Sequence, residues 1–228
     1  PQADWARPSP GLARHPSRRP DAQPVARQHF RRPLLSTRSF IARPTKTGYA
    51  GMYVHYDGYP SNRLPLLLAA YQHRFAGDVE AMARHLIDDV DYGWSELGTD
   101  LLDGAPDALR QALTGGMQYP SRKFTNVINA DGTPAERELV TQATTGGLDW
   151  GYVLHPHGIE VIPLPEEDRG PVVDWTTDPR ARFSDSYARW KPGRPIPATV
   201  PLRATQPNAA PAKPAAAPAS TTRSSARR

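Results

Sequence analysis

The chain contains 228 residues, of which 26 are proline and only 38% are apolar. This composition gives too little core material for the full length to fold, so we expect one modest domain with tails. The sequence contains no cysteine, which excludes disulfides, thiolate zinc sites and a cysteine nucleophile. No apolar run is long enough to span a membrane and no hydrophobic segment follows the basic amino terminus, so we expect a cytoplasmic location without membrane association.

The net charge of +5 is distributed unevenly along the chain. Residues 1–35 contain seven Arg against two Asp, and residues 185–228 contain eight Lys or Arg against one Asp. Residues 36–184 contain 13 basic and 20 acidic residues. This distribution argues against a folded basic groove for nucleic acid, whereas the tails can contact phosphates weakly and without sequence preference.

Both ends of the chain have the composition of disordered segments. Residues 1–35 are rich in Pro and Arg, and ordering them would cost backbone entropy with little apolar burial in return. An organelle transit peptide is also Arg-rich, but the proline density breaks the amphipathic helix that such a signal needs. After the domain we expect an irregular extension over residues 166–184 and a disordered, basic Pro/Ala-rich tail over residues 185–228.

The first predicted elements are a β-hairpin and two helices. Residues 37–43 and 49–56 are rich in β-branched and aromatic side chains and are separated by a Pro/Thr/Gly turn, which predicts an antiparallel pair. Ser61 or Asn62 can then cap a helix with Pro65 in its first turn and an apolar stripe that reaches Phe75. Asp78 can cap a second helix, whose stripe runs from Val79 to Val90.

The second half of the domain is less regular. We expect a weaker helix over residues 100–113, then a long loop over residues 117–147 with one short helix near residues 134–141. Residues 148–154 and 158–164 alternate or run apolar around a His-Pro-His-Gly turn, which predicts a second hairpin. Residues 36–165 therefore predict an α+β domain, with a small antiparallel sheet from two hairpins and two or three helices on one face.

Clustered aromatic and ionisable residues mark the end of the first hairpin as the candidate site. Strand alternation places Tyr49, Gly51, Tyr53 and His55 on one face, and Ala50, Met52, Val54 and Tyr56 on the face toward the core. Asp57 and Tyr59 follow on the turn into the helix, and Trp150 is a further side chain that can stack on a ligand. We take Tyr53, His55, Asp57, Tyr59 and Trp150 as ligand-binding candidates. The alternative is that Asp57-Gly58 is only a structural corner before a helix.

Two catalytic alternatives use the same residues. A hydrolase could use His55 as a general acid or base with Asp57, with or without a metal ion. Metal ligands could come from a set of residues in the two hairpins. No local His or carboxylate spacing requires a metal ion there, so we expect no metal and no cofactor. The members of that set are His55, Asp57, Asp149, His155 and His157. The acidic run Asp88, Asp89 and Asp91 is interpreted as a solvated helix end or, alternatively, a cation or partner site.

Several motifs resemble an uncharacterised family of small actinobacterial and bacteriophage proteins. These motifs are Ser-Thr-Arg-Ser-Phe-Ile-Ala at residues 36–42, Tyr-x-His-Tyr-Asp-Gly-Tyr-Pro at residues 53–60, and Trp-x-Tyr-Val at residues 150–153. Family members typically begin Met-Ser-Thr-Arg and carry His-Trp-Asp-Gly-Tyr-Pro about twenty residues later; here Tyr56 replaces the Trp. The resemblance covers residues 36–164 and implies no activity, cofactor or catalytic residue.

The resemblance also bears on the start of the chain. Family members begin where Leu35 or Ser36 falls, so residues 1–35 are expected to be upstream of the native start. Ser36 would then lie at the amino terminus, where its own amine can activate a hydroxyl nucleophile. That mechanism belongs to a fold with two stacked sheets and more strands than the sequence predicts. The preferred prediction is therefore a small binding or accessory domain with its ligand site at the His-Tyr-Asp-Gly-Tyr-Pro turn.

Overall fold

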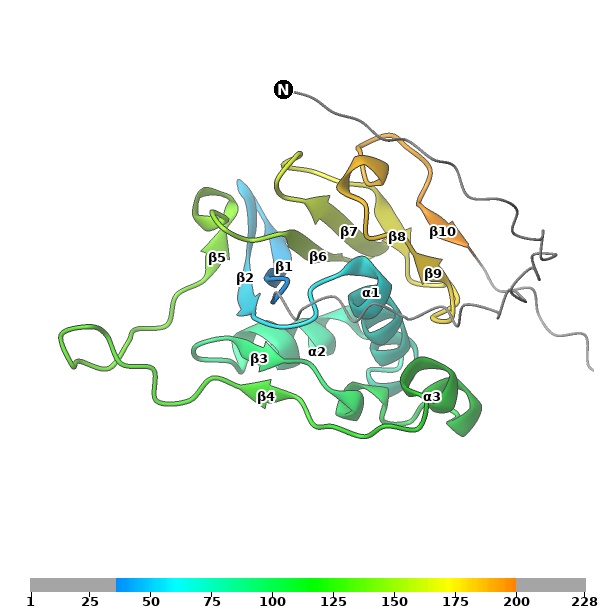
Figure 1. The fold of residues 1–228 in the computed structure, drawn as a ribbon, viewed down its shortest axis with the longest axis horizontal. Coiled ribbons are helices and arrows are strands. Elements are labelled where there is room, and N and C mark those ends of the chain that lie inside the picture. Colours follow the sequence, from blue (N-terminus) through cyan, green and yellow to red (C-terminus); the bar gives the residue numbers. More distant parts are fainter. Residues whose placement is uncertain (1–35, 200–228) are drawn as a thin grey trace, which may run out of the picture. The chain divides into compact units, whose positions relative to one another are not determined.

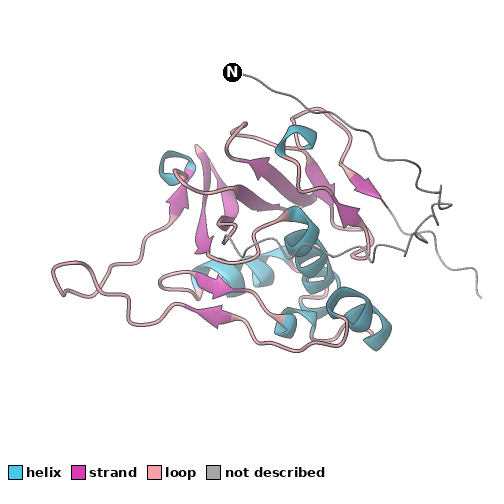
Figure 2. Cartoon of the chain, in the orientation of Figure 1, coloured by secondary structure: helices cyan, strands magenta, loops and turns pink. Residues whose placement is uncertain are grey.

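The computed structural model describes residues 36–199. The expectations for residues 1–35 and for the tail after residue 199, including weak contact with nucleic acid, lie outside the described residues. Within them a mixed eight-stranded sheet carries short helices on one face (Figures 1 and 2). The strands are β1 (Ser39–Thr45), β2 (Gly48–Val54), β3 (Trp94–Glu96), β4 (Arg122–Lys123), β5 (Val140–Thr141), β6 (Trp150–His155), β7 (Gly158–Pro163) and β8 (Val172–Asp174).

Both predicted hairpins are confirmed, and they form the centre of this sheet. The strand order is β4-β3-β2-β1-β6-β7-β8, with β5 paired to β2. The pairs β1–β2 and β6–β7 are antiparallel, whereas β1 pairs with β6 in parallel over Ser39–Ala42. Strands β9 (Arg182–Phe183) and β10 (Ala198–Thr199) form a separate two-stranded sheet.

The α+β class is therefore correct, but the prediction of a small antiparallel sheet is wrong. The sheet is mixed because β1 and β6 run parallel, as do β2 and β3. It is larger because β3, β4, β5 and β8 add two or three residues each. Such short strands contain too few positions for an alternating pattern to be recognised in the sequence.

The helices follow the predicted positions with different ends. They are α1 (Pro60–Ala69), α2 (Val79–Ala83) and α3 (Asp107–Thr114), with π-helical turns at Ala70–Arg74 and Arg84–Asp88 and 3₁₀ turns at Thr99–Leu102, Gln142–Thr144 and Tyr187–Arg189. Asp78 caps α2 as predicted, since its carboxylate accepts a hydrogen bond of 2.9 Å from the Ala81 amide. Gly104 and Pro106 divide the predicted third helix. The segment near residues 134–141, where a short helix was expected, is irregular up to β5.

The amino terminus of α1 is capped from a distant part of the chain. Ser61 or Asn62 was expected to cap it, but the helix already begins at Pro60, and Tyr59 is the cap residue without a side-chain hydrogen bond. Asp185 instead accepts bonds from the Ser61 amide (2.9 Å) and hydroxyl (2.8 Å). A carboxylate at this position satisfies amide donors that the helix leaves unpaired and complements its dipole.

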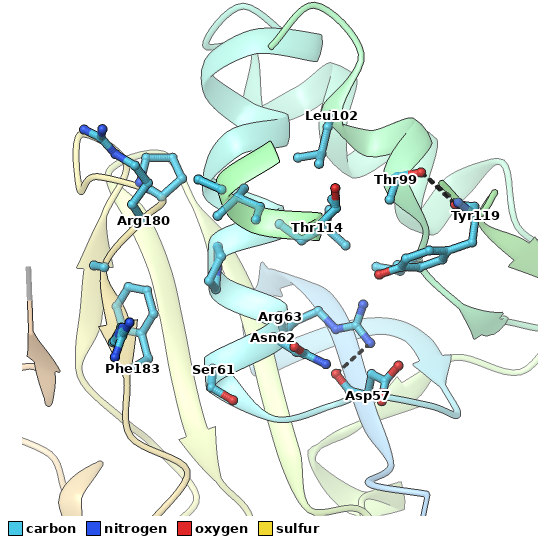
Figure 3. Close-up of a pocket in the computed structure, with 18 residues that line it drawn as sticks. Asp57, Ser61, Asn62, Arg63, Thr99, Leu102, Thr114, Tyr119, Arg180 and Phe183 are labelled. Carbon is cyan, nitrogen blue, oxygen red and sulfur yellow. Dashed lines mark hydrogen bonds between the residues drawn. The ribbon is translucent and has the colours of Figure 1, made fainter. Parts of the chain in front are cut away.

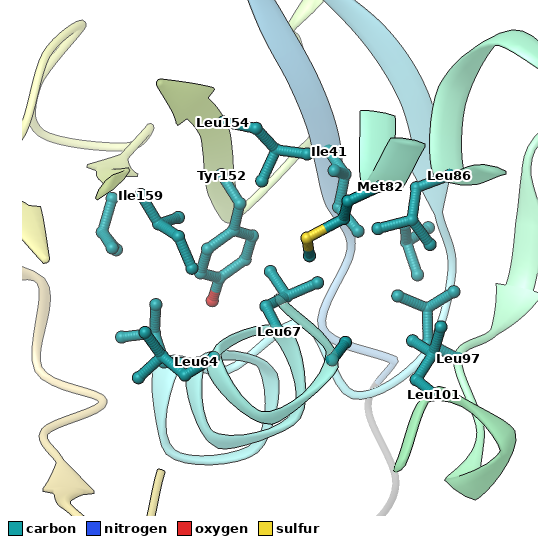
Figure 4. Packing of buried hydrophobic residues seen from close by; sticks show 14 of the residues in the cluster. Ile41, Leu64, Leu67, Met82, Leu86, Leu97, Leu101, Tyr152, Leu154 and Ile159 are labelled. Atoms are coloured by element: carbon teal, nitrogen blue, oxygen red, sulfur yellow. The ribbon is translucent and has the colours of Figure 1, made fainter. Parts of the chain in front are cut away.

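The main core lies between the sheet and the helices (Figure 4). Met52 and Val54 point into it from β2, as the alternation predicts, and Ile41 joins them from β1. They meet Leu67 and Met82 from the helices. Tyr56 was expected on this face but is 41% exposed, because β2 ends at Val54 and the alternation stops there.

The opposite face of the sheet is also partly covered. Phe40, Ala42, Tyr49, Val153 and Ile162 form a second, smaller buried cluster. The Tyr49 ring stacks on Phe40 with ring centroids 4.8 Å apart. Tyr49 is therefore part of a core and not of the exposed aromatic surface that the sequence predicted.

The folded unit continues past residue 165, where the sequence analysis ended the domain. Strand β8 pairs with β7, and the Trp175 ring stacks on Tyr71 with centroids 4.1 Å apart. Phe183 and Trp190 are buried in the main core. Trp190 and β10 also contradict the prediction that a disordered tail begins at residue 185. Three aromatic anchors at irregular spacing form no periodic pattern, which explains why the sequence indicated an irregular extension over residues 166–184 and a tail after it. No helix within residues 36–199 is long and apolar enough to cross a membrane.

Removing the Trp190 side chain should destabilise the whole fold. Trp190 is fully buried, packs against Trp150 and donates a 2.6 Å bond to the Ser184 carbonyl. We expect Trp190→Ala to lower the free energy of unfolding by about 3–5 kcal/mol, measured by urea denaturation. Arg189→Ala, at an exposed neighbour, should have little effect. Equal stability of the two variants would show that this segment does not belong to the cooperative core.

His85 should make stability dependent on pH. Burial, and then the charges of Arg74 and Lys123, lower the pKa of His85, and its Nε2 has no partner within the described residues. As the pH falls below about 6.5, His85 therefore takes up a proton in the unfolded chain before it does so in the folded protein. The folded state loses stability in this range. Between about pH 7 and 5, the loss in unfolding free energy should be smaller for His85→Phe than for the wild type. An identical pH dependence would contradict this assignment.

Candidate functional site

The turn over residues 55–59 connects β2 to α1 and is held by backbone hydrogen bonds. The His55 and Tyr56 amides donate to the carbonyls of Trp94 and Ser95, at 2.9 and 3.0 Å. Asp57 has a φ of +57°, a left-handed conformation that Asp tolerates better than most residues. The chain thus reverses at Asp57, and the predicted sharp turn does not depend on a positive φ at Gly58.

Gly58 is required for a different reason, namely the close approach of the turn to β1. Its amide donates to the Thr37 carbonyl at 3.0 Å, and its carbonyl accepts a 2.6 Å bond from the Tyr152 hydroxyl. A Cβ at this position would lie 2.6 Å from the Thr37 carbonyl oxygen and 2.8 Å from Ser39. Burial raises the pKa of Tyr152, so its hydroxyl stays protonated and remains a donor.

Arg63 fixes the same turn from the side of α1. Its Nη2 donates to the carbonyls of Tyr56 (2.7 Å) and Asp57 (3.2 Å), and the residue is only 2% exposed. Asp57 and Gly58 are therefore bonded to the segment just before β1, to β6 and to α1. A backbone held from three sides presents the adjacent side chains in fixed positions.

A cavity of about 590 Å³ lies beside this turn, between α1, α3 and residues 179–183 (Figure 3). One part of its wall is apolar and includes Leu66, Leu97, Leu102, Leu113 and Phe183. Polar groups also line it, among them Asp57, Asn62, Arg63, Thr99 and Tyr119. Figure 3 shows Asp57, Arg63 and Tyr119 directed toward one end of the cavity. Burial and then the charge of Asp57 raise the pKa of Tyr119, so its hydroxyl is protonated near neutral pH.

His55 and Tyr53 lie on another surface. The Tyr53 hydroxyl and His55 Nδ1 are 2.6 Å apart, and burial raises the pKa of Tyr53. The His55 ring packs edge-on against Tyr56 and Phe124, with centroid distances of 4.4 and 6.1 Å. These four residues form a partly exposed aromatic cluster that does not line the cavity.

The structure thus separates the five residues chosen from the sequence. Asp57 is exposed and lines the cavity, Tyr59 is half-buried at the start of α1, and Tyr53 and His55 belong to the aromatic cluster. Trp150 is fully buried against Tyr187 and Trp190, so its ring is not an accessible stacking surface. Its position in the central strand β6, with side chains packed over it, explains this burial.

Sequence reasoning missed Arg63 and the residues that approach it from elsewhere. A signal for Arg63 was present, because it precedes Leu67 by four positions and therefore lies on the buried side of α1. A basic residue on an apolar stripe needs either a partner or a ligand. Tyr119 and Leu113 gave no comparable signal, since only the tertiary fold brings them to α1.

Three of the remaining candidates, Asp149, Asp88 and His155, are engaged in structural contacts. The Asp149 carboxylate accepts bonds from the Arg38 amide (2.9 Å) and the Tyr187 hydroxyl (3.0 Å). In the acidic run, Asp88 pairs with Arg43 at 2.6 Å. His155 lies 3.0 Å from Glu160, a buried carboxylate that also accepts from Arg169. Within residues 36–199, no group of three or more His, Cys, Asp or Glu side chains is arranged to hold a metal ion.

Comparisons of the chain with protein-family models, curated proteins and solved structures return no match. The resemblance to small actinobacterial and bacteriophage proteins therefore stays an expectation based on the motif residues. The fold and the cavity described above are the basis for a functional hypothesis.

A methyl group at residue 58 should disturb the turn, because the nearest atoms belong to backbone and to a buried side chain. We expect Gly58→Ala to lower the free energy of unfolding by about 2 kcal/mol, measured by urea denaturation. Gly146→Ala is the matched control, since nothing lies within 4 Å of a Cβ there. Similar effects at the two positions would mean that the approach to β1 is not a constraint.

Proposed function

We propose that this protein is a binding domain that holds a small molecule in the cavity beside the His-Tyr-Asp-Gly-Tyr-Pro turn. The observation that carries the proposal is the cavity itself, whose volume of about 590 Å³ falls within the range of small-molecule sites. An apolar wall with a few polar groups at one end is also the usual composition of such sites. The turn chosen from the sequence contributes Asp57 to this lining.

The fixed geometry of the turn supports the same proposal. Binding is stronger when the groups that contact a ligand are already ordered, because less conformational entropy is lost on association. Asp57 follows a strand and precedes a helix, and the carbonyls around it are bonded to Arg63. We therefore interpret the three-sided attachment of the turn as preorganisation of a binding site.

The alternative, a hydrolase that uses His55 and Asp57, has less support. No hydrogen bond joins these two residues in the described part of the chain, and His55 is engaged with Tyr53. Asp57 lines the cavity, whereas His55 does not. A general acid or base must lie within hydrogen-bonding reach of the bound substrate, and the cavity offers His55 no such contact.

We place this binding activity in the cytoplasm, because a chain without cysteine suits a reducing compartment. The motif resemblance suggests an actinobacterial or bacteriophage origin. It brings no activity with it, so the binding hypothesis depends on the cavity.

The proposal is tested by an NMR fragment screen on the full-length protein. Fragments that bind should shift the amide signals of Leu66, Thr99 and Leu113, which line the cavity. Ala112→Trp places a large ring on the exposed, cavity-lining side of α3, and we expect it to weaken these fragments about tenfold or more.

The control for this experiment is Ala143→Trp, at an exposed position outside the cavity lining, which should leave fragment affinity unchanged. A His55→Ala variant should also bind the fragments normally, since His55 belongs to the aromatic cluster. The proposal fails if no fragment shifts the cavity amides, or if those that do are indifferent to Ala112→Trp.

A further inference from the structure

Arg63 carries a buried charge that forms no ion pair with an acidic side chain within residues 36–199. It is 2% exposed and takes part in no ion pair there, although ten other such contacts are formed. Removing a charge from water without a compensating partner is strongly unfavourable. Burial lowers the pKa of Arg63, an effect that Tyr152 and Asp57 oppose only in part. The guanidinium nevertheless keeps its charge at neutral pH.

The hydrogen bonds of Arg63 leave much of the guanidinium unused. Both of its bonds within the described residues come from Nη2 and end on backbone carbonyls, which are neutral acceptors. Its Nε is buried and has no partner there. A guanidinium has five N–H donors arranged in a planar fork that matches a carboxylate or a phosphate. The bonds to the turn therefore account for Nη2 but not for the charge of the side chain.

Arg63 is also one of the residues that line the cavity. Figure 3 shows its guanidinium between Asp57 and Tyr119 at the polar end. Arg182 lines the same cavity and forms no ion pair within the described residues, whereas Arg180 is held by Asp178 at 2.7 Å. The basic groups of the lining that form no ion pair, Arg63 and Arg182, therefore outnumber its single carboxylate, Asp57. This balance favours an anion.

We infer that the ligand of this cavity is a small organic oxyanion, a carboxylate or a phosphate ester, whose charged group pairs with Arg63 while its apolar body lies against the leucine wall. The inference rests on the proposed binding function and specifies its ligand class. The Tyr119 hydroxyl is a second donor at the same end of the cavity. Arg182 attracts the anion as it enters. Leu66, Leu102 and Leu113 explain why the anion carries an apolar group.

The test compares probes that differ in charge, in the oxyanion group or in the presence of an apolar body. Benzoate, phenyl phosphate, neutral benzamide and inorganic phosphate are titrated into the full-length protein, and binding is followed by NMR shifts of the cavity amides. We expect benzoate or phenyl phosphate to bind at least about tenfold more tightly than benzamide, and the stronger of the two identifies the oxyanion. Inorganic phosphate, which has no apolar body, should bind more weakly than phenyl phosphate.

Variants connect this preference to Arg63. Arg63→Gln removes the charge but keeps an amide donor for the turn, and it should abolish the preference for benzoate over benzamide. Arg182→Gln lies at an exposed position and should weaken anion binding about two- to fivefold without loss of the fold. The control is Arg189→Gln, which changes the net charge equally outside the cavity lining and should have no effect. If Arg63→Gln does not fold, the binding of the four probes to the wild type and to Arg182→Gln still tests the oxyanion preference.

The outcomes separate this inference from the proposed function. If benzamide binds as tightly as the two anions, or if the anions shift amides elsewhere, the oxyanion assignment is wrong and the small-molecule pocket stands. If the anions fail while neutral fragments bind in the cavity, the same conclusion follows. If neither the anions nor the broader fragment set reaches the cavity, both assignments are wrong.

Discussion

Strand β1 organises the molecule because it pairs along its two edges with two strands that lie far from each other in the sequence. On one edge it forms a hairpin with β2, and on the other it pairs in parallel with β6. This second contact joins two otherwise separate hairpins into one sheet wide enough to support helices on one face and a smaller cluster on the other. The turn after β2 depends on the same strand, since Gly58 approaches its amino-terminal end closely enough to exclude a side chain.

The turn combines structural and binding roles in one set of contacts. Arg63 holds the carbonyls of Tyr56 and Asp57, and the same side chain brings an uncompensated charge to the cavity. A lysine would supply the charge as a compact point without a planar fork, so it would not serve both purposes equally. Loss of Arg63 therefore affects folding and binding together, which is why ligand chemistry is needed to separate the two effects.

The sequence predicted the parts of the fold that have a strong local pattern. The two hairpins and the apolar stripes of α1 and α2 are continuous over several residues, and Asp78 precedes its helix with a recognisable capping residue. The large sheet was not predictable, because β3 and β8 have three residues each and acquire their partners only in the tertiary structure. Of the five candidate residues chosen from the sequence, Asp57 lines the cavity. The role of His55 was inferred from an alternation that ends at Val54, and the cavity depends on Leu113, Tyr119 and Phe183, which only the tertiary fold brings to α1.

The long sequence separations of these contacts determine when the fold can close during synthesis. The Tyr152–Gly58 bond spans 94 residues and the Asp185–Ser61 bond spans 124. Contacts of this kind slow folding, and at ribosomal speeds β1 waits on the order of ten seconds for β6 to emerge. In that interval its second edge is unpaired, and an unpaired apolar edge is prone to join strands of other chains. Arg43 and Pro44 lie in the part of β1 that β6 never covers, where a charge and a missing N–H donor discourage such pairing.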